Sequence, residues 1–233
     1  MTPPQEIGRR GIILGSAAAI TSTTALTTAG SAQGAVRPKR RTDFAIWDPI
    51  DNRSTASLNP RRVTMHIAVT DSKDIYGPNK GPGGSYAHFY NPVSGRPRQH
   101  QYMTRQAAAD LNGNGTSISV EHQGRPGDAI SANQKTNLAK IFAWAVVYCG
   151  VPNRIASPNN VNGLAWHRLG ISGNFGPFDP NVRTTWSRAQ TGAVWSSASG
   201  KTCPTDKFIR QIGNIYDEAQ IWVQRYRNPP PAV

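Results

Sequence analysis

The sequence is poor in acidic residues and in apolar runs, and it contains only two cysteines. No apolar run approaches the roughly eighteen residues that a membrane span needs, so we expect no stable insertion into a membrane. Hydrophobic residues make up only 37% of the chain, whereas glycine (22) and proline (18) are frequent, which predicts many loops around a modest core. Internal repeats and a second domain are also missing, so the 233 residues are expected to form one domain preceded by a leader.

The shortage of acidic residues gives the protein a strong positive charge. There are 13 acidic against 26 basic residues, and the formal net charge is +13 at pH 7. Such an excess favours a polyanionic partner, either nucleic acid or an anionic wall or membrane surface, although a positive surface also serves solubility. No nucleic-acid-binding motif accompanies the charge. The sequence therefore predicts no nucleic-acid partner and points to anionic wall polymers.

The first 36 residues have the pattern of a bacterial export signal. Arg9 and Arg10 precede a weakly apolar stretch, and small residues over 31–35 offer a cleavage site. Paired arginines before such a stretch are typical of a twin-arginine signal. We therefore expect residues 1–36 to be a signal peptide and the mature protein to be secreted, with a disordered tail as the alternative. A basic arm and lead-in over 37–60 is expected to follow.

Hydrophobic periodicity predicts several strands and then a long helix. Apolar or alternating runs suited to strands occur at 63–69, 87–91, 98–103 and 117–123. Ser131 and Gln134 have the spacing of a capping box, and Gly150 follows the apolar run that begins there. These signals predict a helix that starts after Ser131 and stops at Gly150.

A second helix is expected near the C-terminus. Apolar residues recur at helical spacing over 206–227, and Thr205 is placed to be the N-cap. The tail at 228–233 is expected to be disordered. Strands followed by a helix, a loop and a helix predict an α/β domain in which helices cover one sheet.

Several polar residues lie at the expected ends of strands or in adjoining loops. Two imidazoles and a thiolate, from His66, His167 and Cys203, can hold catalytic zinc and leave its fourth position to water. Zinc lowers the pKa of such a water to about 7 and polarises the carbonyl that the water attacks. The reaction also needs a base and a donor for the oxyanion, and Glu121 and Lys201 are residues of the right types.

The same residues allow other interpretations. A histidine inside a strand, such as His66, is often only a satisfied core residue. Cys203 and His167 could form a cysteine-hydrolase pair, although Pro204 directly after the cysteine does not suit a nucleophile at a helix start. A disulfide between Cys149 and Cys203 is natural in an exported protein and would consume the third zinc ligand. Residue chemistry alone leaves these alternatives open.

Five segments of the chain, taken in order, read VTMHIAVT, SYAHFY, SISVEHQG, WHR and GKTCP. Together they resemble the zinc-dependent N-acetylmuramoyl-L-alanine amidases of type 2, a family that also contains peptidoglycan recognition proteins and phage endolysins. The resemblance covers roughly residues 61–215, and its closest likeness is to amidases of actinobacteria and their phages. It implies a single α/β domain with a central, mainly mixed sheet flanked by helices, and a catalytic domain over 61–227.

The resemblance also implies a function and a role for each site residue. The family hydrolyses the amide between the lactyl group of N-acetylmuramic acid and L-alanine in peptidoglycan. Carried over by position, its zinc ligands fall on His66, His167 and Cys203, its base on Glu121 and its oxyanion lysine on Lys201. We expect a secreted, monomeric peptidoglycan hydrolase that uses zinc-activated water. The alternative is a non-catalytic recognition module of the same fold.

The chain departs from the family pattern where some members carry a catalytic tyrosine. Ala87 occupies that position, and Tyr86 is one residue away, so no catalytic role is assigned to Tyr86. The other histidines are kept out of the metal site. His88 is expected to be structural or to line the cleft, His100 to lie on a surface strand, and His122 to face away from the site.

A second departure is the long step between the last two ligands. We interpret residues 170–200 as a loop insertion near the cleft. Trp186 and Trp195 are its candidate sugar-stacking residues, with anchoring of the insertion as their alternative role.

Overall fold

The computed structural model describes residues 39–51, 53–75, 86–157, 159–170, 195–196 and 203–229. The predicted signal peptide at 1–36 lies outside the described residues, as do Lys201, Trp186, most of the segment interpreted as an insertion and most of the tail.

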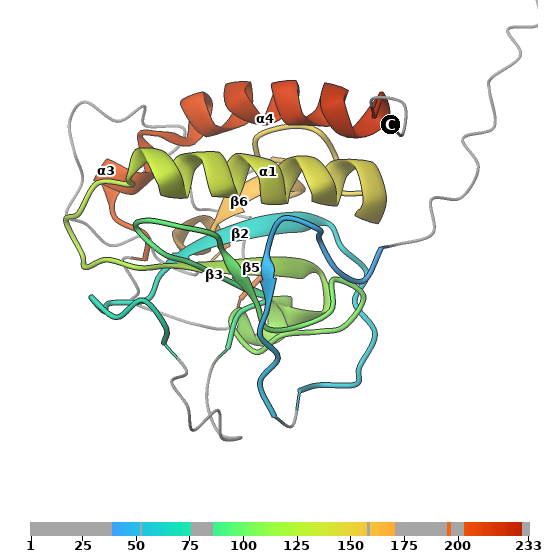
Figure 1. Ribbon diagram of the computed structural model, residues 1–233, viewed down its shortest axis with the longest axis horizontal. Coiled ribbons are helices and arrows are strands. Elements are labelled where there is room, and N and C mark those ends of the chain that lie inside the picture. Colours follow the sequence, from blue (N-terminus) through green and yellow to red (C-terminus); the bar gives the residue numbers. More distant parts are fainter. Residues whose placement is uncertain are drawn as a thin grey trace, which may run out of the picture. The chain divides into compact units, whose positions relative to one another are not determined.

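The core of the protein is a six-stranded mixed sheet (Figure 1). In spatial order its strands are β1 (Ile46–Trp47), β4 (Arg98–Gln99), β3 (Phe89–Asn91), β5 (Ser117–His122), β2 (Arg62–Ile67) and β6 (Gly163–Trp166). All neighbouring strands run parallel except β3 and β4, which are antiparallel. The predicted α/β fold with a mainly mixed central sheet is therefore confirmed.

Two long helices cover one face of this sheet. Helix α1 (Ala132–Cys149) and helix α4 (Ile212–Arg227) lie side by side in Figure 1, and the short helix α3 (Asp206–Ile209) leads into α4. Leu138 and Phe142 of α1 join Ile215 of α4 in the buried apolar core. Two 3-10 helices, η1 (Leu111–Gly115) and η2 (His167–Gly170), lie in the connections.

The alternation of side chains divides the central strands into an apolar face and a polar face. Val63, Met65 and Ile67 of β2 belong to the core cluster that includes the helices. Thr64 and His66 alternate with them and therefore face the other side of the sheet. This polar face, away from α1 and α4, carries the candidate site.

The ends of α1 follow from local sequence signals. The Ser131 hydroxyl accepts a hydrogen bond from the backbone N–H of Gln134, and the Gln134 side-chain oxygen accepts one from the backbone N–H of Ser131. Gly150 ends the helix in the left-handed conformation, with φ of 74°, which glycine adopts without strain. Both predicted helix boundaries are confirmed.

Gln134 also ties the start of α1 to the sheet. Its side-chain amide donates to the carbonyl oxygens of Asn91 at 3.1 Å and of Gln123 at 2.7 Å. Asn91 ends β3, and Gln123 directly follows β5. One capping residue therefore connects the helix to the carboxyl ends of two neighbouring strands.

The predicted C-terminal helix is divided into two. Helix α3 ends at Ile209, and α4 begins at Ile212 after the turn at Arg210 and Gln211. Thr205 precedes α3 with an extended backbone, but it makes no side-chain capping bond. Its hydroxyl instead accepts a hydrogen bond from the backbone N–H of Gly127 at 3.3 Å. Thr205 therefore occupies the predicted N-cap position, but its side chain does not cap the helix.

Strand β6 was not predicted, because its four residues lie at the end of a polar segment that reads as a loop. The strand pairs in parallel with β2, and Gly163 enters it with φ of 114°. A Cβ atom on Gly163 would come within 2.2 Å of the backbone oxygen of Arg154. Glycine is therefore required at this position, because any side chain would strain the backbone and collide with Arg154.

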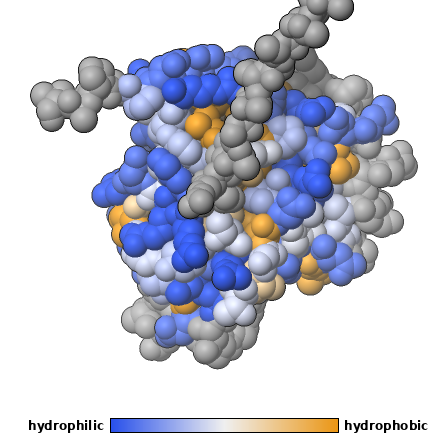
Figure 2. All heavy atoms as spheres, turned by 90° about the vertical axis from the view of Figure 1, so that its right-hand side faces the viewer, coloured by the Kyte–Doolittle hydropathy of each residue, from blue (hydrophilic) through white to orange (hydrophobic). Residues whose placement is uncertain are grey.

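One face of the molecule shows a mainly polar surface. Seen from the right-hand side of Figure 1, hydrophobic residues appear as small separate patches among hydrophilic ones (Figure 2). Large exposed apolar side chains occur singly, at Ile46, Val69, Val93, Leu111 and Ile221. Within the part of the chain that the structure describes, no helix combines the length and apolarity needed to cross a membrane.

Candidate metal centre

Parallel strand pairing brings the predicted site residues to one edge of the sheet. His66 of β2 is the register partner of Glu121 of β5. On the other side of β2, Met65 pairs with Trp166, so His167 follows β6 directly beside His66. Because these strands are parallel, their carboxyl ends meet at the same edge. The expected placement at strand ends is confirmed for His66, Glu121 and His167.

Cys203 joins the two histidines to form a compact group of metal-binding side chains. The candidate ligand atoms of His66, His167 and Cys203 all lie within 4.8 Å of one another. The two imidazole rings are tilted against each other with centroids 4.5 Å apart. The Cys203 sulfur accepts a hydrogen bond from the backbone N–H of Ile67 at 3.1 Å, which fixes the sulfur at the end of β2.

This donor set fits zinc. Two nitrogen donors and one sulfur donor are the ligand types that zinc prefers, and three protein ligands are the usual number at a catalytic site. His66 and His167 are buried, whereas Cys203 is half-buried. The ligand roles stay a prediction that rests on this donor chemistry.

The two cysteines do not form a disulfide. Both Cys149 and Cys203 are free thiols. Cys149 is buried at the end of α1, where desolvation raises the pKa of its thiol to about 12. The alternative of a Cys149–Cys203 disulfide is therefore wrong, and the Cys203 sulfur is available to the group at the strand ends.

Asp110 is a site residue that sequence reasoning missed. Its carboxylate oxygen Oδ1 lies 3.2 Å from Nε2 of His66 and 3.9 Å from Nε2 of His167, and the side chain is 1% exposed. The Asn114 side-chain oxygen accepts hydrogen bonds from the backbone N–H groups of Ala109 and Asp110, at 3.1 and 2.8 Å. One aspartate before a glycine-rich stretch gives no local signal of this role.

The buried pair of His66 and Asp110 is strongly coupled. Burial opposes a charge on His66, but attraction and hydrogen bonding to Asp110, with help from Cys203 and Glu121, outweigh it and hold the imidazole pKa well above 6.5. Burial likewise opposes a charge on Asp110, but His66 and His167 outweigh it and lower the carboxyl pKa. The surroundings of Asp110 therefore favour its carboxylate form.

Glu121 faces the same group from β5. Its oxygen Oε1 lies 4.0 Å from Nδ1 of His66, and its side chain is 17% exposed, more than that of either histidine. A carboxylate that reaches both the metal-binding group and solvent has the access that a proton acceptor needs.

Tyr90 of β3 is the register partner of Glu121 on the far side from His66. Its hydroxyl donates a hydrogen bond to the carbonyl oxygen of Ser72. Burial raises the pKa of the phenol, and the nearby carboxylate of Glu121 raises it further. Tyr90 therefore stays protonated and does not compete with Glu121 as a base. Tyr86 is engaged elsewhere, because its hydroxyl accepts a hydrogen bond from the backbone N–H of Ser54.

The remaining histidines are buried structural residues. His88 lies between the Ser119 hydroxyl and the Arg105 carbonyl, and burial lowers the pKa of its imidazole to about 4. Burial lowers the pKa of His122 to about 3. The expectation that His100 lies at the surface is wrong. Its ring is fully buried, with Nδ1 2.6 Å from the carbonyl oxygen of Asp48.

Trp195 packs tightly against two glycines, Gly170 and Gly113. The backbone N–H groups of Trp195 and Ser196 donate to the Gly170 carbonyl at 3.0 and 2.9 Å. A Cβ atom on Gly170 would come within 2.1 Å of the indole, and one on Gly113 within 2.7 Å. The Arg62 guanidinium lies 4.6 Å from the ring centroid. These contacts favour the anchoring role for Trp195 over sugar stacking.

A buried ion pair connects the two segments that carry His167 and Cys203. Arg168 directly follows His167, and Asp206 begins α3 shortly after Cys203. The Arg168 guanidinium donates a hydrogen bond to the Asp206 carboxylate, and both side chains are almost completely buried. The pair holds together the two segments that carry these candidate ligands.

The described residues form a single α/β domain, with the candidate metal-binding group at the carboxyl ends of its central strands. No known protein family and no curated protein matches the chain in sequence. Solved structures do match it. The Staphylococcus aureus hydrolase AmiA, crystallised with its ligand, superposes with a TM-score of 0.53 at 14% identity, over 82% of this chain and 88% of that one. The endolysin N-acetylmuramoyl-L-alanine amidase LysCS from Clostridium intestinale gives a TM-score of 0.50 at 12% identity, over 78% and 98%. At these identities the likeness establishes the fold.

Proposed function

We propose that this protein is a zinc-dependent peptidoglycan hydrolase that cleaves the amide between N-acetylmuramic acid and L-alanine. The observation that carries the proposal is the grouping of His66, His167 and Cys203 within 4.8 Å at the sheet edge, with Glu121 beside them. The amidase fold supports the choice of substrate, because AmiA and LysCS share it.

The three ligand side chains would hold zinc, which lowers the pKa of a water molecule and polarises the amide carbonyl. Glu121 would take the proton from the attacking water, and the position of its carboxylate, 4.0 Å from Nδ1 of His66 and partly exposed to solvent, supports this role. The same carboxyl group then delivers that proton to the departing L-alanine nitrogen. Asp110 holds the outer nitrogen of His66 and keeps the ring in position.

Lys201 is proposed to stabilise the oxyanion. The lysine lies outside the described residues, and its role rests on its position in the sequence two residues before Cys203. A cationic donor near the carbonyl oxygen would stabilise the negative charge that develops there.

We also propose that the protein acts outside the cell. The leader pattern at 1–36 supports export, and the net charge of +13 supports attraction to an anionic wall. We propose a basic arm at 37–60, a catalytic domain at 61–227 and a tail at 228–233. The protein is expected to be a monomer.

The decisive test uses purified peptidoglycan and mass spectrometry. The wild-type protein should release peptides with a free L-alanine amino group, without new reducing ends on the glycan. A chelator should abolish this release, and zinc should restore it. Glu121→Gln should lower the rate by about a hundredfold to ten-thousandfold and still bind zinc. Full activity of metal-depleted protein would support the cysteine-hydrolase alternative, and binding without cleavage would support the recognition module.

A further inference from the structure

A basic pocket lies beside β1 and β4. These strands are on the β1 side of the sheet, whereas β6 is the outermost strand on the other side. The cavity has a volume of about 420 Å³, within the usual range of ligand sites. Its lining residues come from three segments of the chain, and they are Arg40, then Ile50, Asp51, Arg53, Ser54 and Thr55, and finally Gln101, Tyr102 and Arg105. None of the proposed zinc ligands lines it.

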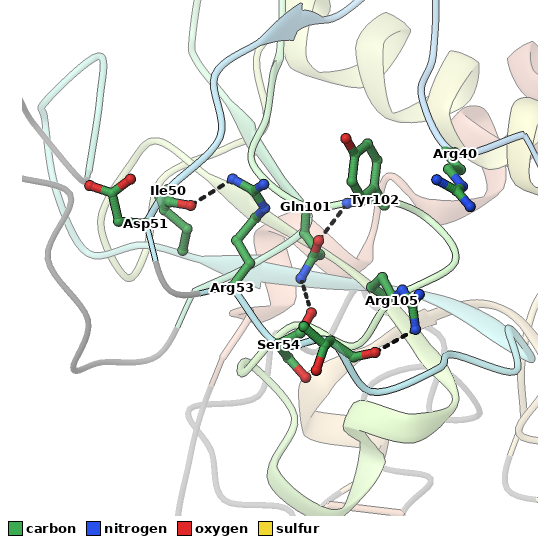
Figure 3. A pocket seen from close by; sticks show the side chains of 9 residues that line it. Arg40, Ile50, Asp51, Arg53, Ser54, Gln101, Tyr102 and Arg105 are labelled. Atoms are coloured by element: carbon green, nitrogen blue, oxygen red, sulfur yellow. Dashed lines mark hydrogen bonds between the residues drawn. The ribbon is translucent and has the colours of Figure 1, made fainter.

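Three arginines dominate the lining of this pocket. In Figure 3, Arg53 and Arg40 lie on opposite sides of Tyr102, and Arg105 lies below them. Asp51 is the only acidic residue in the lining, so the formal charge is +2 (3 minus 1). Within the described residues, none of the three arginines forms an ion pair with a carboxylate. The positive charge is therefore available to a ligand.

Hydrogen bonds from one buried side chain help to hold the pocket in shape. The Gln101 side chain is 1% exposed, and its amide donates to the carbonyl oxygens of Ser54 and Gln106, both at 3.0 Å. The bond to Ser54 joins the segment that carries Arg53 to the segment after β4, and the bond to Gln106 lies within the latter segment. Arg53 is fixed as well, because its guanidinium donates to the Ile50 carbonyl at 2.7 Å. Hydrogen bonds thus hold Arg53 and the Gln101 side chain in place in the lining.

The chemistry of the lining selects phosphate among anions. Arginine presents several donors in a planar fork, which matches the oxygens of phosphate and forms charge-assisted hydrogen bonds. Three separate guanidinium groups around one cavity suit a tetrahedral anion approached from several sides better than a planar carboxylate, which one fork can satisfy.

The surrounding rings do not suit a nucleobase. Tyr102 is stacked on Trp47, with ring centroids 4.8 Å apart. The guanidinium of Arg41 lies 4.5 Å from the Trp47 ring, and that of Arg40 lies 5.8 Å from the Tyr102 ring. Binding of single-stranded nucleic acid usually needs an open aromatic face for stacking. Here both rings are already covered.

We propose that this pocket binds phosphodiester groups of an anionic wall polymer with a sugar or polyol backbone. The affinity for phosphate oxygens follows from the pocket itself, whereas the choice of a phosphodiester wall polymer rests on the proposed function. Binding here would tether the protein to the wall by a surface separate from the proposed zinc ligands.

The test is a binding titration of the full-length protein with a glycerol phosphodiester oligomer at about 0.15 M ionic strength. Arg40→Gln and Arg53→Gln should each weaken binding about tenfold, as expected for loss of a charge-assisted hydrogen bond. Arg227→Gln, at the end of α4, removes the same charge elsewhere and should change the affinity less than twofold. Thermal unfolding of each variant checks that the fold is retained.

Three results would overturn the proposal. Equal losses in the pocket variants and in Arg227→Gln would show attraction by net charge alone. Equally tight, pocket-dependent binding of a single-stranded oligonucleotide of the same charge would assign the pocket to nucleic acid. Displacement of the oligomer by inorganic phosphate, with the two at the same total concentration of phosphate groups, would show that the pocket binds the free ion. Because the assay involves no cleavage, its outcome is independent of amidase activity.

Discussion

The carboxylate of Asp110 lies 3.2 Å from the outer nitrogen Nε2 of His66, and the same oxygen lies 3.9 Å from Nε2 of His167. Nε2 of His66 thus faces this carboxylate, whereas Nε2 of His167 lies between it and the Ser196 hydroxyl, which is 3.3 Å away. Asp110 would then orient two ligands at once, which is the role that outer carboxylates have at zinc sites.

Removal of this carboxylate should weaken zinc binding. Asp110→Ala is expected to raise the zinc dissociation constant about tenfold to a hundredfold, as measured by competition with a chromogenic chelator. Asp110→Asn keeps an acceptor oxygen but removes the charge, so it should weaken zinc binding less than Asp110→Ala does. Unchanged zinc affinity in both variants would restrict Asp110 to a packing role.

The two cysteines should differ sharply in reactivity. In metal-depleted native protein at pH 8, Cys203 is half-buried and should react with a thiol reagent within minutes. Cys149 is buried with its pKa raised to about 12, so almost none of its reactive thiolate is present and it should not react. Denaturation without reductant should expose two thiols, and zinc added to the native protein should protect Cys203. Fewer than two thiols in the denatured, unreduced protein would contradict the free cysteines.

Stability should depend on the protonation of His88. The pKa of this buried imidazole is lowered to about 4, against about 6.5 in the unfolded chain. Between these values the unfolded chain binds a proton that the folded protein does not, so the free energy of unfolding falls as pH decreases from 6.5 to 4. The contribution of this group is about 3 kcal/mol over that range. Urea unfolding of the wild type and His88→Gln should show a shallower pH dependence in the variant, and parallel curves would contradict the assignment.

Removing one partner of the buried Arg168–Asp206 pair should lower the free energy of unfolding strongly. Replacing both partners with apolar residues should lower it much less. Arg168→Met leaves the Asp206 carboxylate buried without its cation and should cost about 3–5 kcal/mol. The double variant Arg168→Met/Asp206→Leu should recover most of that loss, because apolar side chains need no charged partner. Urea unfolding in the presence of a chelator measures both without a contribution from zinc. Equal loss in the single and double variants would mean that the pair also organises neighbouring groups.

Features coded by neighbouring residues were predictable from the sequence. The capping box of Ser131 and Gln134, the left-handed Gly150 and the apolar run of β2 all carry signals within a few positions. His66, Glu121 and His167 could be assigned to one edge because parallel strands place their ends together. Cys203 entered the candidate site through donor chemistry and the family resemblance.

Features that depend on distant contacts were not predictable. Asp110 and the Arg168–Asp206 pair owe their roles to partners far along the chain. His100 is buried because the Asp48 segment covers it, which a polar neighbourhood in the sequence does not reveal. Strand β6 is recognisable only once β2 is there to pair with it.

The side chain of Gln134 makes the start of α1 and the edge of the sheet depend on each other. Its amide holds the carbonyls that end β3 and follow β5, and its oxygen closes the first helical turn. Fraying of that turn would therefore release the strand ends beside Glu121 in the same event. Amide hydrogens in the first turn of α1 and at the end of β5 should show one common free energy of opening in hydrogen exchange, as members of a single cooperative unit.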